Sequence, residues 1–163
     1  MLDIDFINSF FFFLIAANAA FQKHILKEYI QLMVLDYLAA TLYVNKLAFI
    51  GGTNLRLIKG IDRFSEDLDF DCKALTAEEF AAMTDSVIVF LQRSGLRVEA
   101  RDKANPKLTA YRRNIYFPEF LFELGLTGHK EERFLLKIEA QDQGCAYPTE
   151  MKHVQRCGFF FSL

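Results

Sequence analysis

The chain has 163 residues, a length that fits one domain of ordinary size. Hydrophobic residues make up 52% of it and charged residues 25%, which excludes a disordered or collagen-like chain. The formal net charge of -2 excludes a uniformly basic protein that coats nucleic acid. The three cysteines form no C-x-x-C pair, so neither a disulfide framework nor a zinc ribbon is predicted, and a reducing cytoplasm is the expected compartment.

The N-terminal segment is rich in phenylalanine. Positions 10–17 read FFFFLIAA, and positions 17–19 resemble a small-residue cleavage site. The stretch before them carries Asp3 and Asp5 but no Lys or Arg, whereas a secretory signal begins with positive charge. The apolar run is also shorter than the ~20 residues that cross a bilayer, so no membrane partner is expected. We interpret the segment as a packed helix or as an apolar patch for a partner.

Helical patterns open the chain. Apolar residues recur at spacings of three and four over positions 21–43, which predicts one long helix. Positions 47–50 (LAFI) form a short apolar run that a Gly-Gly pair ends, which predicts a buried strand and a tight turn. A short helix is predicted from near Thr53 to near Gly60.

Strand patterns then alternate with one more helix. Positions 67–71 (DLDFD) alternate acidic and apolar residues, which is the period of a strand. Thr76 begins a capping pattern for a second long helix that ends near Gly95. Further strands are predicted at 96–101, 114–122 and 134–140.

This order of elements indicates the fold class. Helices followed by a run of strands are typical of an α+β domain, here with a mostly antiparallel or mixed sheet and flanking helices. No internal repeat and no linker divides the chain. We therefore predict a single domain over 1–163, with a helical segment at about 1–44 and a core at about 45–163.

The Gly-Gly pair has the features of a phosphate-binding turn. Gly51 and Gly52 let the backbone come close to a ligand, and the free N–H groups at the start of the next helix favour an anion. Thr53 adds a hydroxyl group. Taken alone, a Gly-Gly pair before a helix also fits an ordinary turn.

The acidic strand that follows has the features of a metal site. Asp67, Asp69 and Asp71 share one face of the predicted strand. Like charges this close need a counter-charge, and a hard divalent cation is the usual one. An alternating acidic strand also fits a solvated sheet face, but a phosphate site beside a metal site predicts phosphoryl or nucleotidyl transfer.

A calcium-binding loop is a further interpretation of the acidic stretch. Asp67, Asp69, Asp71 and Glu78 fall at positions 1, 3, 5 and 12 of such a loop. Cys72 occupies the position that needs glycine, and the apolar residues between the acids alternate as in a strand. Both observations argue against the loop.

The segments GGTNLR (51–56) and RFSEDLDFD (63–71) together resemble the signature of the AbiEii/AbiGii-type nucleotidyltransferase toxins of abortive-infection and toxin-antitoxin systems. This family is similar in fold to polymerase-beta-like nucleotidyltransferases. The resemblance implies that Asp67 and Asp69 hold Mg²⁺ (or Mn²⁺) and that the glycine turn grips the triphosphate of an NTP. It also implies an RNA acceptor, typically tRNA, and a cognate antitoxin as a partner.

Several other residues are candidates for the same site. The predicted nucleotide-binding set is Gly51, Gly52, Thr53, Arg56, Arg63 and Ser65. Two roles fit the arginines: contact with phosphate, or neutralisation of the acidic strand. Ser65 fits either as a residue that orients Asp67 or as a cap of the turn. Glu139 is the candidate third catalytic and metal-binding carboxylate by its strand pattern, and its alternative is a surface ion pair with Lys137.

The distribution of charge suggests where RNA binds. Acidic residues dominate positions 62–85 and basic residues dominate positions 93–113. An acidic metal site beside a basic segment suits a polyanionic substrate. We therefore predict that Arg112 and Arg113 contribute to RNA binding, although a solvated helix end and hairpin would carry similar charges.

The resembling family continues beyond the equivalent of Leu163 into a helical part with further motifs. We therefore expect a short member of the family that builds the nucleotide site. The alternative to an active transferase is a catalytically incomplete relative that acts as a nucleotide-binding or protein-interaction module.

Overall fold

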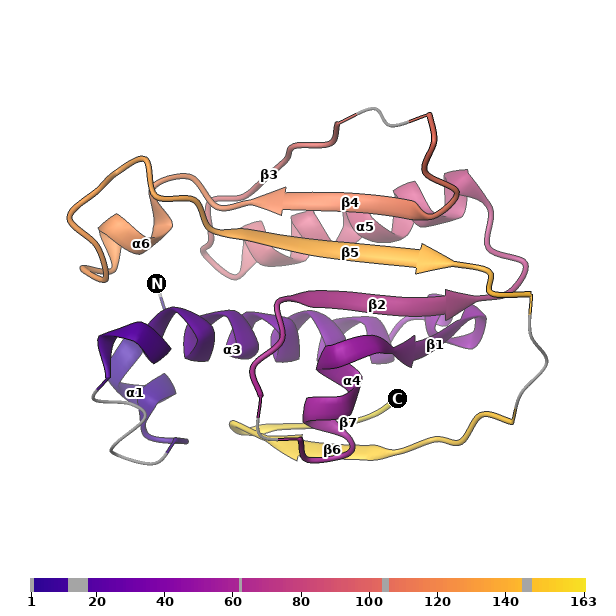
Figure 1. Ribbon diagram of the computed structural model, residues 1–163, viewed down its shortest axis with the longest axis horizontal. Helices are drawn as coiled ribbons and strands as arrows, with labels where there is room; N and C mark the ends of the chain where they lie inside the picture. The colour runs from indigo at the N-terminus through magenta and orange to yellow at the C-terminus, as the bar shows by residue number, and fades with distance from the viewer. Residues whose placement is uncertain (1, 12–17, 62, 104–105, 145–147) are drawn as a thin grey trace.

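A five-stranded sheet in the order β1-β2-β5-β4-β3 forms the middle of the molecule (Figure 1). The computed structural model describes residues 2–11, 18–61, 63–103, 106–144 and 148–163. The strands of the sheet are β1 (Leu47–Ile50), β2 (Asp67–Cys72), β3 (Glu99–Ala100), β4 (Tyr111–Tyr116) and β5 (Leu135–Gln141). The helices are α1 (Ile4–Asn8), α3 (Ala19–Ala39), α4 (Gly51–Leu57), α5 (Ala77–Arg93), α6 (Phe120–Glu123) and the 3-10 helix η1 (Leu42–Lys46).

The sheet is mixed, as predicted. β1 pairs antiparallel with β2, β2 pairs parallel with β5, and β4 pairs antiparallel with both β5 and β3. Alternate residues along β5 are buried, which leaves one sheet face covered and the other partly open. Figure 1 shows α3 and α5 running behind the sheet, so the face toward the viewer is the open one. The α+β class is confirmed.

The two long helices follow their sequence signals. The Asn18 side chain accepts a hydrogen bond from the backbone N–H of Ala20 and so caps α3. The predicted capping box of α5 is present, because Thr76 and Glu79 each accept a hydrogen bond from the other's backbone N–H. α3 ends earlier than predicted, at Ala39, and η1 connects it to β1.

Three other predicted elements have different boundaries in the structure. The predicted strand 114–122 ends at Tyr116, because Pro118 has no N–H for a ladder and Glu119 adopts a positive φ of 53° before α6. The predicted strand 96–101 shrinks to the two residues of β3. The short helix predicted from Thr53 begins at Gly51 instead and ends at Leu57.

A two-stranded hairpin, β6 (His153–Arg156) and β7 (Phe159–Ser162), lies apart from the main sheet. It packs against α3 through β7, and Val154 and Phe161 on its inner face are buried. Positions 12–17, predicted as a packed helix or an apolar patch, lie outside the described residues. Within the described ranges, no helix is both long and apolar enough to cross a membrane.

Candidate functional site

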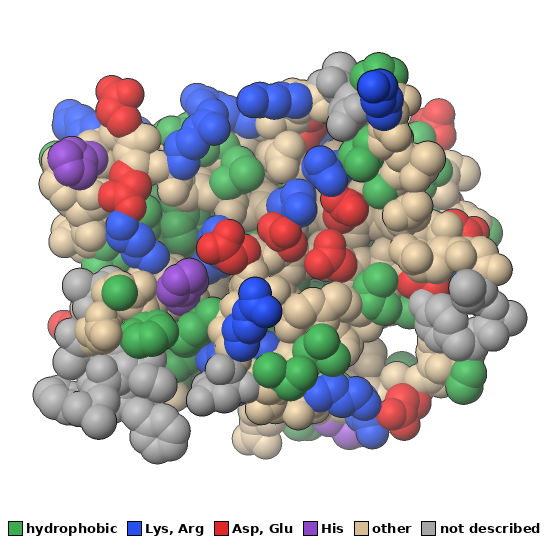
Figure 2. Space-filling model, viewed as in Figure 1, with side chains coloured by type: hydrophobic (Ala, Val, Ile, Leu, Met, Phe, Trp, Pro, Cys, Tyr) green, Lys and Arg blue, Asp and Glu red, His purple; other side chains and the backbone are tan. Residues whose placement is uncertain are grey.

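The predicted acidic residues meet on the open face of the sheet. The register of β2 with β5 places Asp69 beside Glu139 and Asp67 beside Lys137. All four side chains point to the same face, because residues two apart along a strand share a side. Figure 2 shows acidic side chains gathered over the middle of this face with Lys and Arg side chains around them. The structure therefore brings Asp67 and Asp69 close to Glu139, although Glu139 is far from both aspartates in the sequence.

Among the three carboxylates, Asp69 has a raised pKa. Its pKa is raised above the ordinary value of an aspartate, first by burial and then by the negative charges of Asp67 and Glu139. Lys137 and Arg112 oppose the shift without cancelling it. The site therefore carries an excess of negative charge at Asp69, which an additional cation would neutralise.

Two of the three carboxylates already contact basic side chains. Lys137 Nζ lies 2.9 Å from Asp67 Oδ2, and Arg112 donates to Glu139 Oε2 from Nε at 2.8 Å and from Nη2 at 2.7 Å. The alternative that Glu139 pairs with Lys137 is wrong, because each basic residue reaches across to a neighbouring strand. Among the described residues, no three His, Cys, Asp or Glu side chains stand close enough to form a ready-made metal site. Carboxylate oxygens are ligands that a hard cation prefers. In this structure, the carboxylates of Asp67 and Glu139 form ion pairs with Lys137 and Arg112.

The glycine turn lies directly against this carboxylate group. Gly51 has a φ of +79°, and a Cβ at this position would stand 2.7 Å from Asp69 Oδ2. A Cβ on Gly52 would stand 2.8 Å from Ser65 Oγ. Neither space admits a methyl group without displacement of a site side chain. The turn and the acidic strand therefore form one continuous surface.

Thr53 fastens α4 to the acidic strand. Its side chain is buried, and its hydroxyl donates a hydrogen bond to the backbone carbonyl of Asp67. The predicted role of Thr53 was to offer a hydroxyl to phosphate. The structure instead turns that hydroxyl inward, where it sets the position of the glycine turn relative to β2.

Arg56 also points inward from α4. Its guanidinium is only 7% exposed, forms an ion pair with Glu28 of α3, and lies 3.9 Å from the ring centroid of Phe64. Glu28 is 1% exposed and accepts from Nη2 of both Arg56 and Arg156 at 3.3 Å. Arg56 thus neutralises a buried acid of α3, and this ion pair holds α4 against α3.

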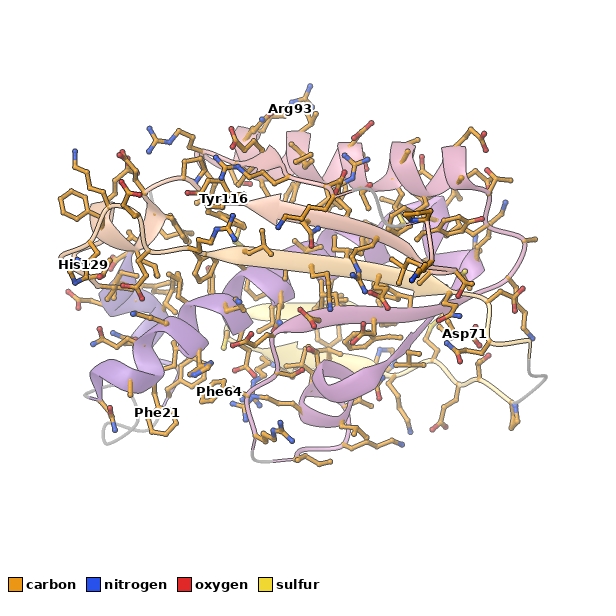
Figure 3. The ribbon with its side chains drawn as sticks, turned by 45° about the horizontal axis from the view of Figure 1, so that its top comes forward. Phe21, Phe64, Asp71, Arg93, Tyr116 and His129 are labelled. Atoms are coloured by element: carbon orange, nitrogen blue, oxygen red, sulfur yellow. The ribbon has the colours of Figure 1, made fainter. Side chains whose placement is uncertain are left out.

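Helix α3 also holds the loop between α4 and β2. Gln31 of α3 is buried and donates from Nε2 to the backbone carbonyl of Ser65 at 3.0 Å. Phe64 of this loop packs beside Phe21, at 6.0 Å between ring centroids (Figure 3). Arg63 is exposed in the loop, so it is the arginine of the predicted nucleotide-binding set that faces solvent. Ser65 lies directly against Gly52 of the glycine turn.

Comparison with known protein families gives the identity of this arrangement. The family model for the nucleotidyl transferase AbiEii toxin of type IV toxin-antitoxin systems matches residues 34–152. The chain belongs to the AbiEii family. The match begins near the end of α3 and includes β1, α4, β2, β4 and β5, the elements that carry the glycine turn and the carboxylates.

Solved structures share the fold of this AbiEii-family chain. MenT4, a nucleotidyltransferase toxin from Mycobacterium tuberculosis H37Rv, is 20% identical with a TM-score of 0.63, over 99% of this chain and 53% of that chain. JHP933 from Helicobacter pylori is 22% identical with a TM-score of 0.51, over 84% of this chain and 50% of that chain. The chain thus spans about half the length of these relatives. No curated protein sequence matches it significantly.

The last aspartate of the acidic strand has a separate role in this AbiEii-family chain. Asp71 is buried at the far end of β2 (Figure 3), and its Oδ1 accepts a hydrogen bond from the backbone N–H of Gln143 at 3.0 Å. It therefore fixes the segment that leaves β5. Because residues 67–72 form a strand and not a loop, the calcium-loop interpretation is wrong.

Sequence reasoning missed three residues that shape the AbiEii site. Lys137 was considered only as a partner of Glu139, and Glu28 and Gln31 were not singled out. Glu28 and Gln31 are polar residues three apart on α3, a spacing that places both on one face, and both lie among buried apolar residues. Polar residues on the buried face of a helix are the signal that would have identified them.

Proposed function

We propose that this AbiEii-family chain forms the nucleotide-binding and catalytic core of a metal-dependent nucleotidyltransferase. The reaction moves a nucleotide from an NTP to an RNA acceptor, with tRNA the expected RNA, in the cytoplasm. The observation that carries the proposal is the close approach of Gly51 to Asp69, because it places the glycine turn directly beside the carboxylates of β2 and β5. Family membership supports a cognate antitoxin as a partner.

The chemistry assigns a role to each part of the site. An RNA hydroxyl oxygen attacks the α-phosphorus of the NTP, the new O–P bond forms, the bond to the β-phosphate oxygen breaks, and pyrophosphate leaves. The backbone N–H groups of Gly51 and Gly52 bind the triphosphate, and a carboxylate next to the acceptor, Glu139, takes the hydroxyl proton. Asp67, Asp69 and Glu139 would hold Mg²⁺ or Mn²⁺, and the bound ion would supply positive charge for the phosphates.

Nucleotide binding to the purified chain tests this proposal. We expect NTP binding that requires Mg²⁺ or Mn²⁺ and that weakens at least tenfold in the Asp67→Asn/Asp69→Asn double variant. The control is Glu78→Gln/Glu131→Gln, which removes the same charge from two exposed positions outside the site. Equal NTP affinity in wild type and in the site variant, with or without metal, would contradict the proposal. Calcium binding without nucleotide would contradict it as well.

A second candidate function is a nucleotide-binding module that does not catalyse transfer. The ion pairs of Lys137 with Asp67 and of Arg112 with Glu139 favour it, because they hold carboxylates that catalysis requires. Single-turnover assays with labelled NTP and total tRNA separate the two candidates. Labelled RNA supports the transferase, whereas metal-dependent NTP binding without labelled RNA supports the module.

The glycine turn allows a matched pair of substitutions. Gly51→Ala and Gly60→Ala both place alanine at a positive φ, +79° and +73°, which costs about 1–2 kcal/mol of stability each. Only at Gly51 does the new Cβ collide with Asp69, since nothing lies within 4 Å at Gly60. We expect Gly51→Ala to lose NTP binding at least tenfold and Gly60→Ala to retain it within twofold, as measured by calorimetry. Equal losses in the two variants would show that backbone strain, and not the contact with Asp69, matters.

A further inference from the structure

The two neighbouring arginines of β4 point to opposite faces of the sheet. Arg112 lies opposite Glu139 in the register with β5, and Arg113 lies opposite the buried Ile138. Arg113 is 14% exposed and contacts Asp85 of α5 at 3.0 Å, with Asp102 at 3.5 Å. The prediction that both arginines contribute to one RNA-binding surface is therefore wrong for Arg113, which binds the helix side of the sheet.

Arg112 stands at the edge of the candidate site. Across the open face, the register places Asp69, Glu139 and Arg112 in one row on β2, β5 and β4. Adjacent strands are about 4.8 Å apart, so Arg112 lies roughly 10 Å from Asp69. The glycine turn lies against Asp69 at the β1 side of the row. Arg112 and the glycine turn therefore lie on opposite sides of the carboxylates.

A hollow of about 180 Å³ adjoins Arg112 on this side. The polar and charged residues among its lining are Asp102, Lys103, Arg112 and Asn114. Asp102 is already engaged, because it accepts from the backbone N–H of Asn114 at 2.9 Å and contacts Arg113. Lys103 is exposed and Arg112 is 33% exposed, so two cationic side chains line this hollow, and Arg112 connects it to Glu139.

We propose that Arg112 binds a backbone phosphate of the acceptor RNA and so brings the reacting hydroxyl to Glu139. This inference rests on the proposed nucleotidyltransferase function. A guanidinium that already donates two hydrogen bonds to a carboxylate has the geometry to donate to phosphate oxygens. The NTP is the other possible source of a phosphate, but the glycine turn follows β1, which β2 and β5 separate from β4. The acceptor and the NTP thus approach the carboxylates from opposite edges of the row.

Fluorescence anisotropy with a labelled single-stranded RNA of tRNA acceptor-end sequence tests the inference, with NTP binding measured in parallel. We expect Arg112→Ala to weaken RNA binding about tenfold, and the slope of log K against log salt to fall by ~0.7, the value for one phosphate contact to single strands. NTP affinity is expected to stay within twofold. The control is Arg93→Ala, since Arg93 is exposed at the end of α5 and projects away from the sheet (Figure 3).

A second comparison separates phosphate contact from charge repulsion. Arg112→Ala also leaves Glu139 without its described partner, and this carboxylate then repels RNA. The double variant Arg112→Ala/Glu139→Gln, compared with Glu139→Gln alone, removes that repulsion. A tenfold loss of RNA binding in this pair as well supports a phosphate contact, whereas equal affinity of the two variants overturns it.

The outcomes for the two proposals are distinct. Wild type that binds NTP but no RNA, or an Arg112→Ala variant with wild-type RNA affinity, overturns the role of Arg112 and leaves the nucleotide site standing. Loss of NTP binding without loss of RNA binding in Arg112→Ala also overturns it, because the phosphate contacted is then that of the NTP. Failure of wild type to bind NTP overturns the proposed function itself.

Discussion

Asp69→Asn is expected to abolish nucleotide transfer while making the protein more resistant to heat at pH 7. The pKa of Asp69 is raised by burial and by the charges of Asp67 and Glu139, so the folded protein favours the protonated carboxyl. The ionised form therefore lowers the free energy of unfolding at pH 7, and the neutral amide removes that cost. Transfer should fall at least ~100-fold, since a lost metal ligand removes several kcal/mol of transition-state stabilisation.

The pH dependence follows from the sign of the shift. Because the folded-state pKa lies above the unfolded one, the stabilising effect of the protonated Asp69 is complete below the unfolded pKa of about 4 and is lost as the pH rises through the folded pKa. The melting temperature of Asp69→Asn should therefore exceed that of wild type at pH 7 and approach it near pH 4. Circular dichroism between pH 3.5 and 8 measures both curves.

An aspartate outside the site provides the control for this experiment. Asp5→Asn makes the same chemical change at an exposed position of α1, and we expect neither transfer nor the pH dependence of melting to change. A melting temperature of Asp69→Asn below that of wild type at pH 7 would assign Asp69 a structural role. Wild-type transfer by Asp69→Asn would remove it from the catalytic site.

Glu28→Ala is expected to cause the largest loss of stability among single substitutions at a buried charge. Glu28 is 1% exposed and contacts the guanidinium groups of both Arg56 and Arg156. Removing one member of a buried ion pair costs about 3–5 kcal/mol, because a charge stays in the interior without its counter-charge. The melting temperature should fall by roughly 6–20 °C, at 2–4 °C per kcal/mol for a domain of this size. Urea denaturation measures the free energy directly.

The control for Glu28 is Glu66→Ala, an acid at an exposed position of the loop before β2. We expect its free energy of unfolding to stay within about 0.5 kcal/mol of wild type. Glu28→Ala should also weaken NTP binding, since Arg56 belongs to the helix that begins with the glycine turn. A loss of stability below about 1 kcal/mol would mean that the buried network contributes little and that water takes the place of Glu28.

Local patterns predicted the elements whose partners lie nearby in sequence. The strand at 47–50 has the predicted bounds, and the acidic strand extends one residue beyond the alternation, to Cys72. The capping box of α5 was readable because Thr76 and Glu79 satisfy each other's backbone within one turn. The carboxylate pair of β2 was found in the same way, since a period of two places both on one face.

Tertiary partners explain what the sequence did not reveal. Thr53 and Arg56 carry groups that suit phosphate, but their partners are a carbonyl of β2 and an acid of α3, which no local pattern connects to them. Arg112 and Arg113 point to opposite faces because β4 begins at Tyr111, three residues before the predicted strand, so the sequence analysis did not separate them. Strand 114–122 was overextended because its aromatic content outweighed Pro118.

The parallel pairing of β2 with β5 makes the site a late product of folding. Asp69 and Glu139 are 70 positions apart, and nothing but this pairing places them side by side. Pairings between distant segments form slowly, because the intervening chain must first close a long loop. During synthesis, the ribosome must release β5 before the three carboxylates can gather. A nascent chain that ends before β5 therefore carries the glycine turn and the acidic strand but lacks Glu139, the third carboxylate of the candidate site.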